Sequence, residues 1–136
     1  MAINTEIASR TFYVNGDAGG TSSWSSNSDK RLKKEINTID NALAKVLKLR
    51  GVQFQWKSTD NHPEGKQIGF IAQEAKDIVP EVIDEKDGYF SMKYAPIVAL
   101  LVEAIKELNA EKEAMKKIIC SELSEHELCQ GDIPDN

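Results

Sequence analysis

The sequence predicts an α+β protein with a small head of helices and a β-hairpin, followed by a long C-terminal helix. Three observations indicate this class. A helical pattern of apolar residues begins after Ser28-Asp29, and short strand patterns lie between residues 52 and 92. From about Pro96, apolar residues recur at alternating steps of three and four, over about three heptads. This last pattern is typical of a helix that packs on copies of itself.

Composition limits the classes of protein to consider. The chain has 136 residues, a net charge of −5, 40% apolar residues and 29% charged residues. This length allows one compact domain, or one small domain with an arm. The acidic balance argues against nucleic acid as a partner, because phosphate binding needs a basic surface. We expect no membrane partner either, since no apolar stretch approaches the roughly 18 residues of a membrane helix and no signal-peptide pattern is present.

Residues 1–27 differ in composition from the rest of the chain. They carry only three formal charges and are rich in Gly, Ser, Thr and Asn. Residues 11–14 have the β-branched and aromatic character of a short strand that ends at Asn15-Gly16, and residues 16–23 favour loop. So short a strand needs a sheet that this chain does not supply. We therefore expect residues 1–27 to be the end of a larger structure.

The first predicted helix starts after Ser28-Asp29, whose side-chain oxygens can cap a first helical turn. Its apolar face consists of Leu32, Ile36, Ile39, Leu43, Val46 and Leu47, and Gly51 ends it. Residues 52–57 alternate strictly, which predicts a half-buried strand with Val52, Phe54 and Trp56 on one side. A polar loop at residues 58–66 follows.

The middle of the chain predicts a short helix and a hairpin. Residues 68–72 lead into a helix over residues 73–79, which Pro80 ends. Strands at residues 81–84 and 89–92 flank Asp87-Gly88, a strong turn signal for a β-hairpin.

The long helix allows two interpretations. Its narrow apolar seam (Val98, Leu101, Ile105, Leu108, Met115 and Ile119, with Lys112 at the one polar place) favours self-association over residues 105–119. Alternatively, Ile97, Leu100 and Val102 widen the stripe, so that residues 97–105 cover the protein's own sheet. Beyond Cys120 the pattern fades into an acidic tail. Cys120 and Cys129 could link only this tail, and the redox compartment favours two free thiols.

Few residues offer catalytic chemistry. His62 and His126 are the only histidines, in a loop and in the tail, so no Ser-His-Asp or Cys-His arrangement is predicted. The phosphate-loop, zinc and calcium motifs are all absent, and we expect neither metal nor cofactor. Asp84, Glu85 and Asp87 are best explained as a solvated charge run.

Ser28 and Lys33 remain as candidates. A serine can be activated by a neutral lysine, and the neighbouring Arg31 and Lys34 favour that form of Lys33. Inside one regular helix, five residues turn by about 500°, so the two side chains would not face each other. The pair therefore requires Ser28 to lie outside the helix on an extended approach. On composition alone, Ser28 is equally explained as a helix cap.

A resemblance bears on this choice. The runs Ser28-Asp29-Lys30-Arg31-Leu32-Lys33 and Gly69-Phe70-Ile71-Ala72-Gln73-Glu74 carry it, together with Phe54-Gln55-Trp56, Pro80, Tyr94 and residues 104–108. In order and spacing, residues 28–119 resemble the C-terminal intramolecular chaperone domain of phage tail spikes, tail fibres, neck appendages and endosialidases.

The resemblance implies a homotrimer that holds three fibre chains in register while they fold, and then releases itself by cleaving the Asn27–Ser28 bond. It assigns Ser28 as nucleophile and Lys33 as general base, acting by an N-to-O acyl shift or by direct displacement, followed by hydrolysis. Asp29, Gln73 and Glu74 match motif positions and are expected to support the site. Leu101, Ile105, Leu108 and Met115 are the expected oligomer seam.

The resemblance also divides the chain and places its parts. Residues 1–27 become the end of the fibre, residues 28–119 the chaperone, and residues 120–136 an acidic tail. Assembly would take place in the host cytoplasm, with the fibre part ending in the virion. Two alternatives stay open: the same trimeric module without cleavage, in which Ser28 is only a cap, and an unrelated coiled-coil adaptor with a small α+β head.

Overall fold

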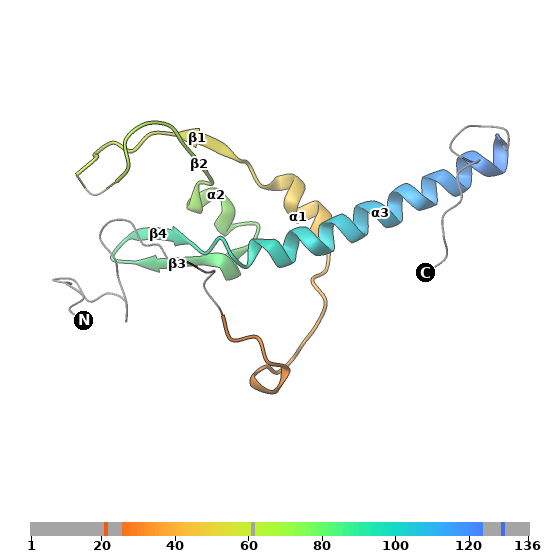
Figure 1. Ribbon diagram of the computed structural model, residues 1–136, viewed down its shortest axis with the longest axis horizontal. Helices are drawn as coiled ribbons and strands as arrows, with labels where there is room; N and C mark the ends of the chain where they lie inside the picture. Colours follow the sequence, from red (N-terminus) through yellow and green to blue (C-terminus); the bar gives the residue numbers. More distant parts are fainter. Residues whose placement is uncertain (1–20, 22–25, 61, 124–128, 130–136) are drawn as a thin grey trace. The chain divides into compact units, whose positions relative to one another are not determined.

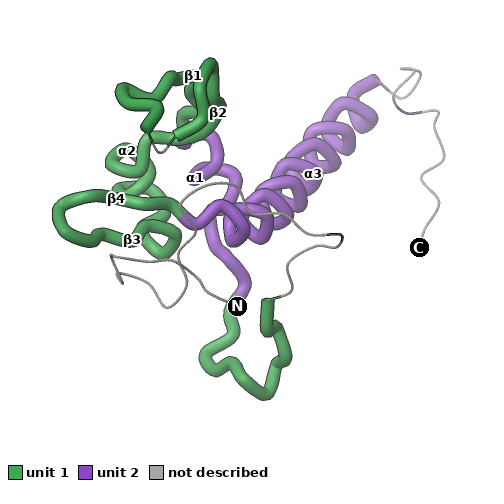
Figure 2. The backbone as a smooth tube through the Cα atoms, turned by 60° about the vertical axis from the view of Figure 1, so that its left-hand side comes forward, with its two compact units in different colours: residues 1–37, 50–92 green, residues 38–49, 93–136 purple. Residues whose placement is uncertain are grey.

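The computed structural model describes residues 21, 26–60, 62–123 and 129, and it confirms the α+β class (Figure 1). Two compact units are formed (Figure 2). One contains the described residues up to position 37 together with residues 50–92, and the other contains residues 38–49 and those from position 93 onward. The strand predicted at residues 11–14 lies outside the described residues. No helix in the described ranges is long and apolar enough to cross a membrane.

The predicted first helix is wrong over most of its length. Only a 3₁₀ turn, η1 (Lys30–Leu32), and the short helix α1 (Ala42–Lys48) form, and Glu35 and Asn41 between them take left-handed φ values of 53° and 54°. Leu32 and Ile36 are exposed. A helix gains most of its stability from packing an apolar face, and η1 contains no buried residue. The periodicity before residue 42 is therefore not sufficient to form a helix.

In the first unit, β1 (Val52–Phe54) pairs antiparallel with β2 (Gln67–Gly69), with Val52 opposite Gly69 and Phe54 opposite Gln67. β1 is shorter than predicted. Val52 and Phe54 are half-buried as expected, whereas Trp56 lies beyond the strand and is exposed. The Trp56 ring meets Phe54 edge to face, with ring centroids 5.2 Å apart, and stacks on His62 at 3.9 Å. The strand prediction therefore holds for its first half only.

The same unit holds α2 (Ala72–Lys76), the 3₁₀ turn η2 (Pro80–Val82) and the hairpin of β3 (Ile83–Lys86) with β4 (Tyr89–Met92). The predicted hairpin turn is confirmed, since Asp87 and Gly88 both have positive φ. α2 ends at Lys76, three residues earlier than predicted. Val79 has φ −139°, as expected of a residue that precedes a proline and avoids the helical region. Ala75, Val79 and Val82 form the buried core here.

In the second unit, α1 packs against the long helix α3 (Ile97–Glu122). The buried stripe of α3 is Ile97, Leu100 and Ala104, and it shares the core with Ala42 of α1. The described partner of this stripe is α1, and Val102, which was expected to widen the stripe, is exposed. Sequence periodicity identifies an apolar stripe but does not name the surface that covers it.

α1 is also capped from α3. Asn41 makes no side-chain capping bond, and the Glu107 carboxylate accepts the N–H groups of Ala42 at 2.9 Å and Leu43 at 2.8 Å. These bonds satisfy two of the free amides that every helix start exposes. They also lower the pKa of Glu107, because they favour its charged form. Glu107 thereby fastens the start of α1 to α3.

The cysteines correct a further expectation. Cys120 near the end of α3 and Cys129 form a disulfide, with a sequence separation of nine, where the compartment argument favoured free thiols. That argument concerns the surroundings of a protein and not its local geometry. The Cα atoms of Cys120 and Cys129 lie 5.7 Å apart, a separation that suits a disulfide. Of the predicted acidic tail, residues 120–122 belong to α3, and residues 124–128, with His126, and 130–136 lie outside the described residues.

Candidate functional site

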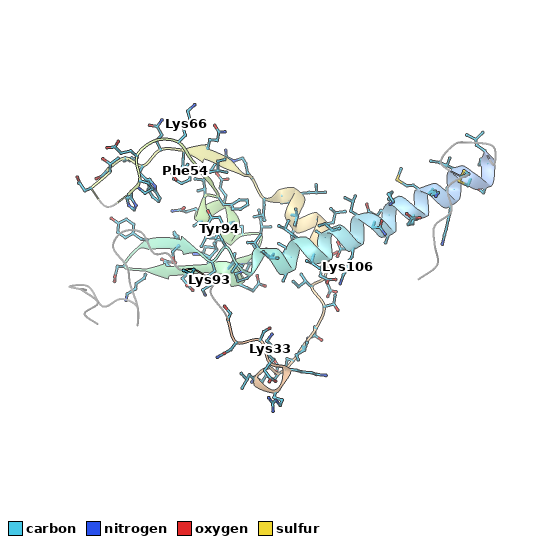
Figure 3. All side chains as sticks on the ribbon, viewed as in Figure 1. Lys33, Phe54, Lys66, Lys93, Tyr94 and Lys106 are labelled. Atoms are coloured by element: carbon cyan, nitrogen blue, oxygen red, sulfur yellow. A yellow bond between two sulfur atoms is a disulfide. The ribbon has the colours of Figure 1, made fainter. Side chains whose placement is uncertain are left out.

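The site begins with Ser28 and Lys33, which the structure brings together. The Nζ atom of Lys33 donates a hydrogen bond to Ser28 Oγ over 2.7 Å. Asp29 before η1 and Lys33 after it both have extended backbones, and the three residues of η1 turn the chain between them. Ser28 therefore lies outside the helical turn, which is the condition that the sequence set for this pair. Figure 3 labels Lys33 beside η1.

Asp29 organises the turn. Its Oδ1 atom accepts the backbone N–H of Arg31 at 2.8 Å, which makes Asp29, and not Ser28, the cap of η1. The Arg31 guanidinium also forms an ion pair with the Asp29 carboxylate, with Nη2 2.7 Å from Oδ2. This arrangement holds the pKa of Asp29 below its usual value through the side-chain and backbone bonds to Arg31. Because Asp29 fills the capping position, the Ser28 hydroxyl is available to bind Lys33.

The pair is open to solvent. Every described residue from 26 to 38 is exposed, including Asn27, so the Asn27–Ser28 peptide bond is accessible. Water screens charges at such a surface and competes for hydrogen bonds. The local chain thus places a nucleophile and a base within reach of each other, but it does not supply the dry surroundings in which electrostatic catalysis is strong.

The predicted supporting residues lie on α2. Gln73 and Glu74 are both exposed, and Glu74 forms a two-point ion pair with Arg50, whose Nε lies 3.0 Å from Glu74 Oε2. This pairing lowers the pKa of Glu74 and raises that of Arg50. Within the described residues, no hydrogen bond joins Gln73 or Glu74 to Ser28 or Lys33. Their supporting role stays a prediction.

Two charged groups at these places were not predicted. Arg31 was considered only as a cation near Lys33, but its geometry makes it the partner of Asp29. The one available signal was its spacing, since an acid at a cap can reach a cation two residues on. Arg50, which holds Glu74, lies 24 residues away in sequence and gives no local signal.

The predicted oligomer seam forms a second candidate surface. Leu101, Ile105, Leu108 and Met115 remain 41%, 65%, 53% and 62% exposed along α3. At the polar place of the series, Lys112 pairs with its neighbour Glu113 at 3.1 Å. A row of large apolar side chains left open along one helix is typical of a surface that binds another protein.

Metal and histidine chemistry add nothing to the site. In the part of the chain that the structure describes, no three His, Cys, Asp or Glu side chains are grouped to hold a metal ion. His62 is engaged by Trp56, against which its ring is stacked. The chemistry of the described residues therefore centres on Ser28 and Lys33.

Fold and site together define a small α+β protein that contains both a hydrogen-bonded serine–lysine pair and a long helix with an exposed apolar seam. Residues 28–84 match the Peptidase S74 family, described as "Chaperone of endosialidase". Residues 28–84 therefore form a Peptidase S74 chaperone-of-endosialidase domain, as the sequence resemblance predicted. An unrelated adaptor is thereby ruled out.

Two tail-fibre proteins are similar to the chain. They are the long tail fiber protein Gp37 of Enterobacteria phage K3 and that of Enterobacteria phage T2, each 35% identical over 99 residues. The similar region covers 68% of this chain, but only 8% and 7% of the two fibre proteins. The chain thus spans a small part of the length of these relatives.

Proposed function

We propose that this chain is the intramolecular chaperone domain of a phage tail fibre, which assembles as a homotrimer and releases itself by cleaving Asn27–Ser28. The main support for this proposal is that two independent observations concern the same residue, Ser28. The family match begins at Ser28, and the hydroxyl of Ser28 lies 2.7 Å from the Lys33 amine. A cut before Ser28 would release the matched domain with Ser28 as its first residue.

The proposed reaction is an N-to-O acyl shift followed by hydrolysis. Neutral Lys33 Nζ takes the proton from Ser28 Oγ, and Oγ attacks the carbonyl carbon of Asn27. The C–N bond to Ser28 breaks, its nitrogen receives the proton from Lys33 and becomes an amine, and an ester joins Asn27 to Oγ. Water then hydrolyses the ester, which leaves a carboxylate on Asn27 and restores the Ser28 hydroxyl. The 2.7 Å separation suits a proton moving in either direction between the two atoms.

The chaperone role follows from how an intertwined fibre folds. Three chains that must wind together form mainly long-range contacts, so their folding is slow and prone to aggregation. A trimer formed first by α3 would raise the local concentration of the fibre ends and fix their register. Cleavage afterwards would leave a fibre that is kinetically trapped in its folded form. Under this proposal, residues 1–27 are the end of the fibre, residues 28–119 the chaperone and residues 120–136 its tail.

The proposal also places the parts. The domain would act in the host cytoplasm during assembly, and the fibre part would enter the virion. Its partners are two further copies of the chain and the upstream part of the same polypeptide.

The alternative is a trimeric module that never cleaves, with Ser28 as a cap only. One observation weighs against it: the cap of η1 is Asp29, whose carboxylate accepts the Arg31 N–H, whereas Ser28 Oγ is engaged by Lys33. A capping role therefore does not account for the serine.

The test is an intact mass spectrum under denaturing conditions. We expect a fragment that begins at Ser28, and its loss in Ser28→Ala with the oligomer retained in sedimentation. Ser26→Ala is the matched control, because Ser26 is also exposed, two residues away, and should cleave normally. A full-length mass at every time and pH would contradict self-cleavage. A monomer at micromolar concentration would contradict the trimer.

A further inference from the structure

Arg31 occupies both oxygens of the carboxylate beside the nucleophile. Its Nε lies 3.1 Å from Asp29 Oδ1 and 3.2 Å from Oδ2, and its Nη2 lies 2.7 Å from Oδ2. The backbone N–H of Arg31 adds a further bond to Oδ1 at 2.8 Å. Arg31 therefore makes four hydrogen bonds to this one acid.

This acid could compete with Ser28 for the lysine. Asp29 is adjacent to Ser28 and is the only acidic residue between positions 28 and 34. A carboxylate and an ammonium form a charge-assisted bond about twice as strong as a neutral one. Such a pair would also favour the charged form of the amine. A charged amine cannot accept the serine proton, so an Asp29–Lys33 ion pair would disable the base.

Among the described residues, the other charges next to Lys33 in the sequence are those of its own exposed segment. Lys30 and Lys34 carry positive charges. Glu35 carries a negative charge on the other side of Lys34, where the backbone is left-handed. Asp29 is therefore the acid next to the serine, and Arg31 holds it.

We propose that Arg31 is a positioning residue that engages Asp29 and so keeps this carboxylate from pairing with Lys33. The inference rests on the proposed self-cleavage at Ser28. It assigns Arg31 no contact with the reacting atoms. By engaging Asp29, Arg31 keeps the Lys33 amine available for its hydrogen bond with the Ser28 hydroxyl.

The first test is the pH profile of cleavage in the full chain. With Arg31→Gln, the freed carboxylate should raise the pH of half-maximal rate by roughly half a unit or more, the effect of one charge about 4 Å away in water. Asp29→Asn removes the charge but keeps a good capping side chain. In that background, adding Arg31→Gln should move the midpoint clearly less, because only the loss of the charge of Arg31 itself remains. A merely structural role would lower the rate at every pH and leave the midpoint in place.

Two results would overturn the inference. One is an Arg31→Gln variant with an unchanged midpoint. The other is an equal shift with and without Asp29→Asn, since Arg31 would then act through its own charge and not through Asp29.

A second measurement does not depend on cleavage. In a Ser28→Ala background with ¹³C-labelled lysine, the Cε resonance of Lys33 reports its protonation, and Lys33→Arg identifies that resonance by its loss. Arg31→Gln should move this titration to higher pH, and in the presence of Asp29→Asn the movement should be clearly smaller. An unmoved titration would refute the role of Arg31. Absence of cleavage in the unmutated chain would instead refute self-cleavage, so the two failures are distinguishable.

Discussion

Lys33 donates a 2.7 Å hydrogen bond to Ser28 although neither residue is shielded from water. The pair is thus built by the 3₁₀ turn between the two residues and not by a buried pocket. Local geometry of this kind can be present in a single chain before any assembly. What a single chain does not provide is the exclusion of water, and this distinction underlies the first two predictions.

The first prediction concerns the base. Replacing Lys33 with Ala should slow the appearance of the Ser28 fragment by about 100-fold or more, since a positioned general base contributes at least that much. Lys34→Ala is the control, because it removes an equal charge from the next residue. The fragment is followed by mass spectrometry over time. A normal rate in Lys33→Ala would show that the base is misassigned.

The second prediction concerns the seam. Leu108→Asp places a charge in the exposed apolar row of α3 and should dissociate the trimer, which sedimentation equilibrium measures as a fall to the mass of one chain. Ala110→Asp adds the same charge to an exposed position of α3 outside the seam and should leave the mass unchanged. If assembly shields the Ser28–Lys33 pair, Leu108→Asp should also slow cleavage. An unchanged mass in Leu108→Asp would remove the seam from the proposal.

The sequence was most informative where chemistry is local. Asp87-Gly88 predicted its hairpin because both turn positions need positive φ, and this preference is a property of the residues themselves. The heptad seam of α3 was predicted for a similar reason, since it depends on spacing alone. The Ser28–Lys33 geometry was conditional on an extended approach to the turn, and the extended backbone of Asp29 before η1 meets this condition.

The sequence was misleading where an element depends on its packing partner. Leu32 and Ile36 have helical spacing, but both are exposed; Leu32 lies in the 3₁₀ turn η1 and Ile36 in no helix. Glu107 caps α1 from 64 and 65 residues away, so no local motif could have revealed it. Periodicity states which residues could share a face, whereas only the fold determines whether that face is covered.

The third prediction concerns the pH dependence of stability. The amides of Leu43 and Ala42, with a smaller effect of Lys45, lower the pKa of Glu107 in the folded protein. A carboxyl whose folded pKa is lowered stabilises the fold at pH values above its unfolded value, taken as 4.5, and this contribution is lost as the pH falls through the folded value. Glu107→Gln should therefore lower Tm by a few degrees at neutral pH.

Thermal unfolding at several pH values is the measurement. The gap in Tm between Glu107 and Glu107→Gln should narrow as the pH is lowered below about 4. Glu111→Gln is the control, because Glu111 is exposed one helical turn further along α3. A gap that stays constant down to pH 2 would mean that the carboxylate charge does not contribute to the cap.

The last prediction uses two adjacent leucines to separate the two faces of α3. Leu100 is 5% exposed in the core with α1, whereas Leu101 is 41% exposed on the seam. Leu100→Ala should lower the free energy of unfolding by roughly 2–5 kcal/mol, because it leaves a cavity in the core. Leu101→Ala removes the same atoms from an open surface, so it should have a small effect on the folded single chain and a larger one on trimer affinity. Urea unfolding at low protein concentration measures the first effect and sedimentation the second. Equal losses of stability for both variants in the dissociated chain would contradict the division of α3 into a core face and an assembly face.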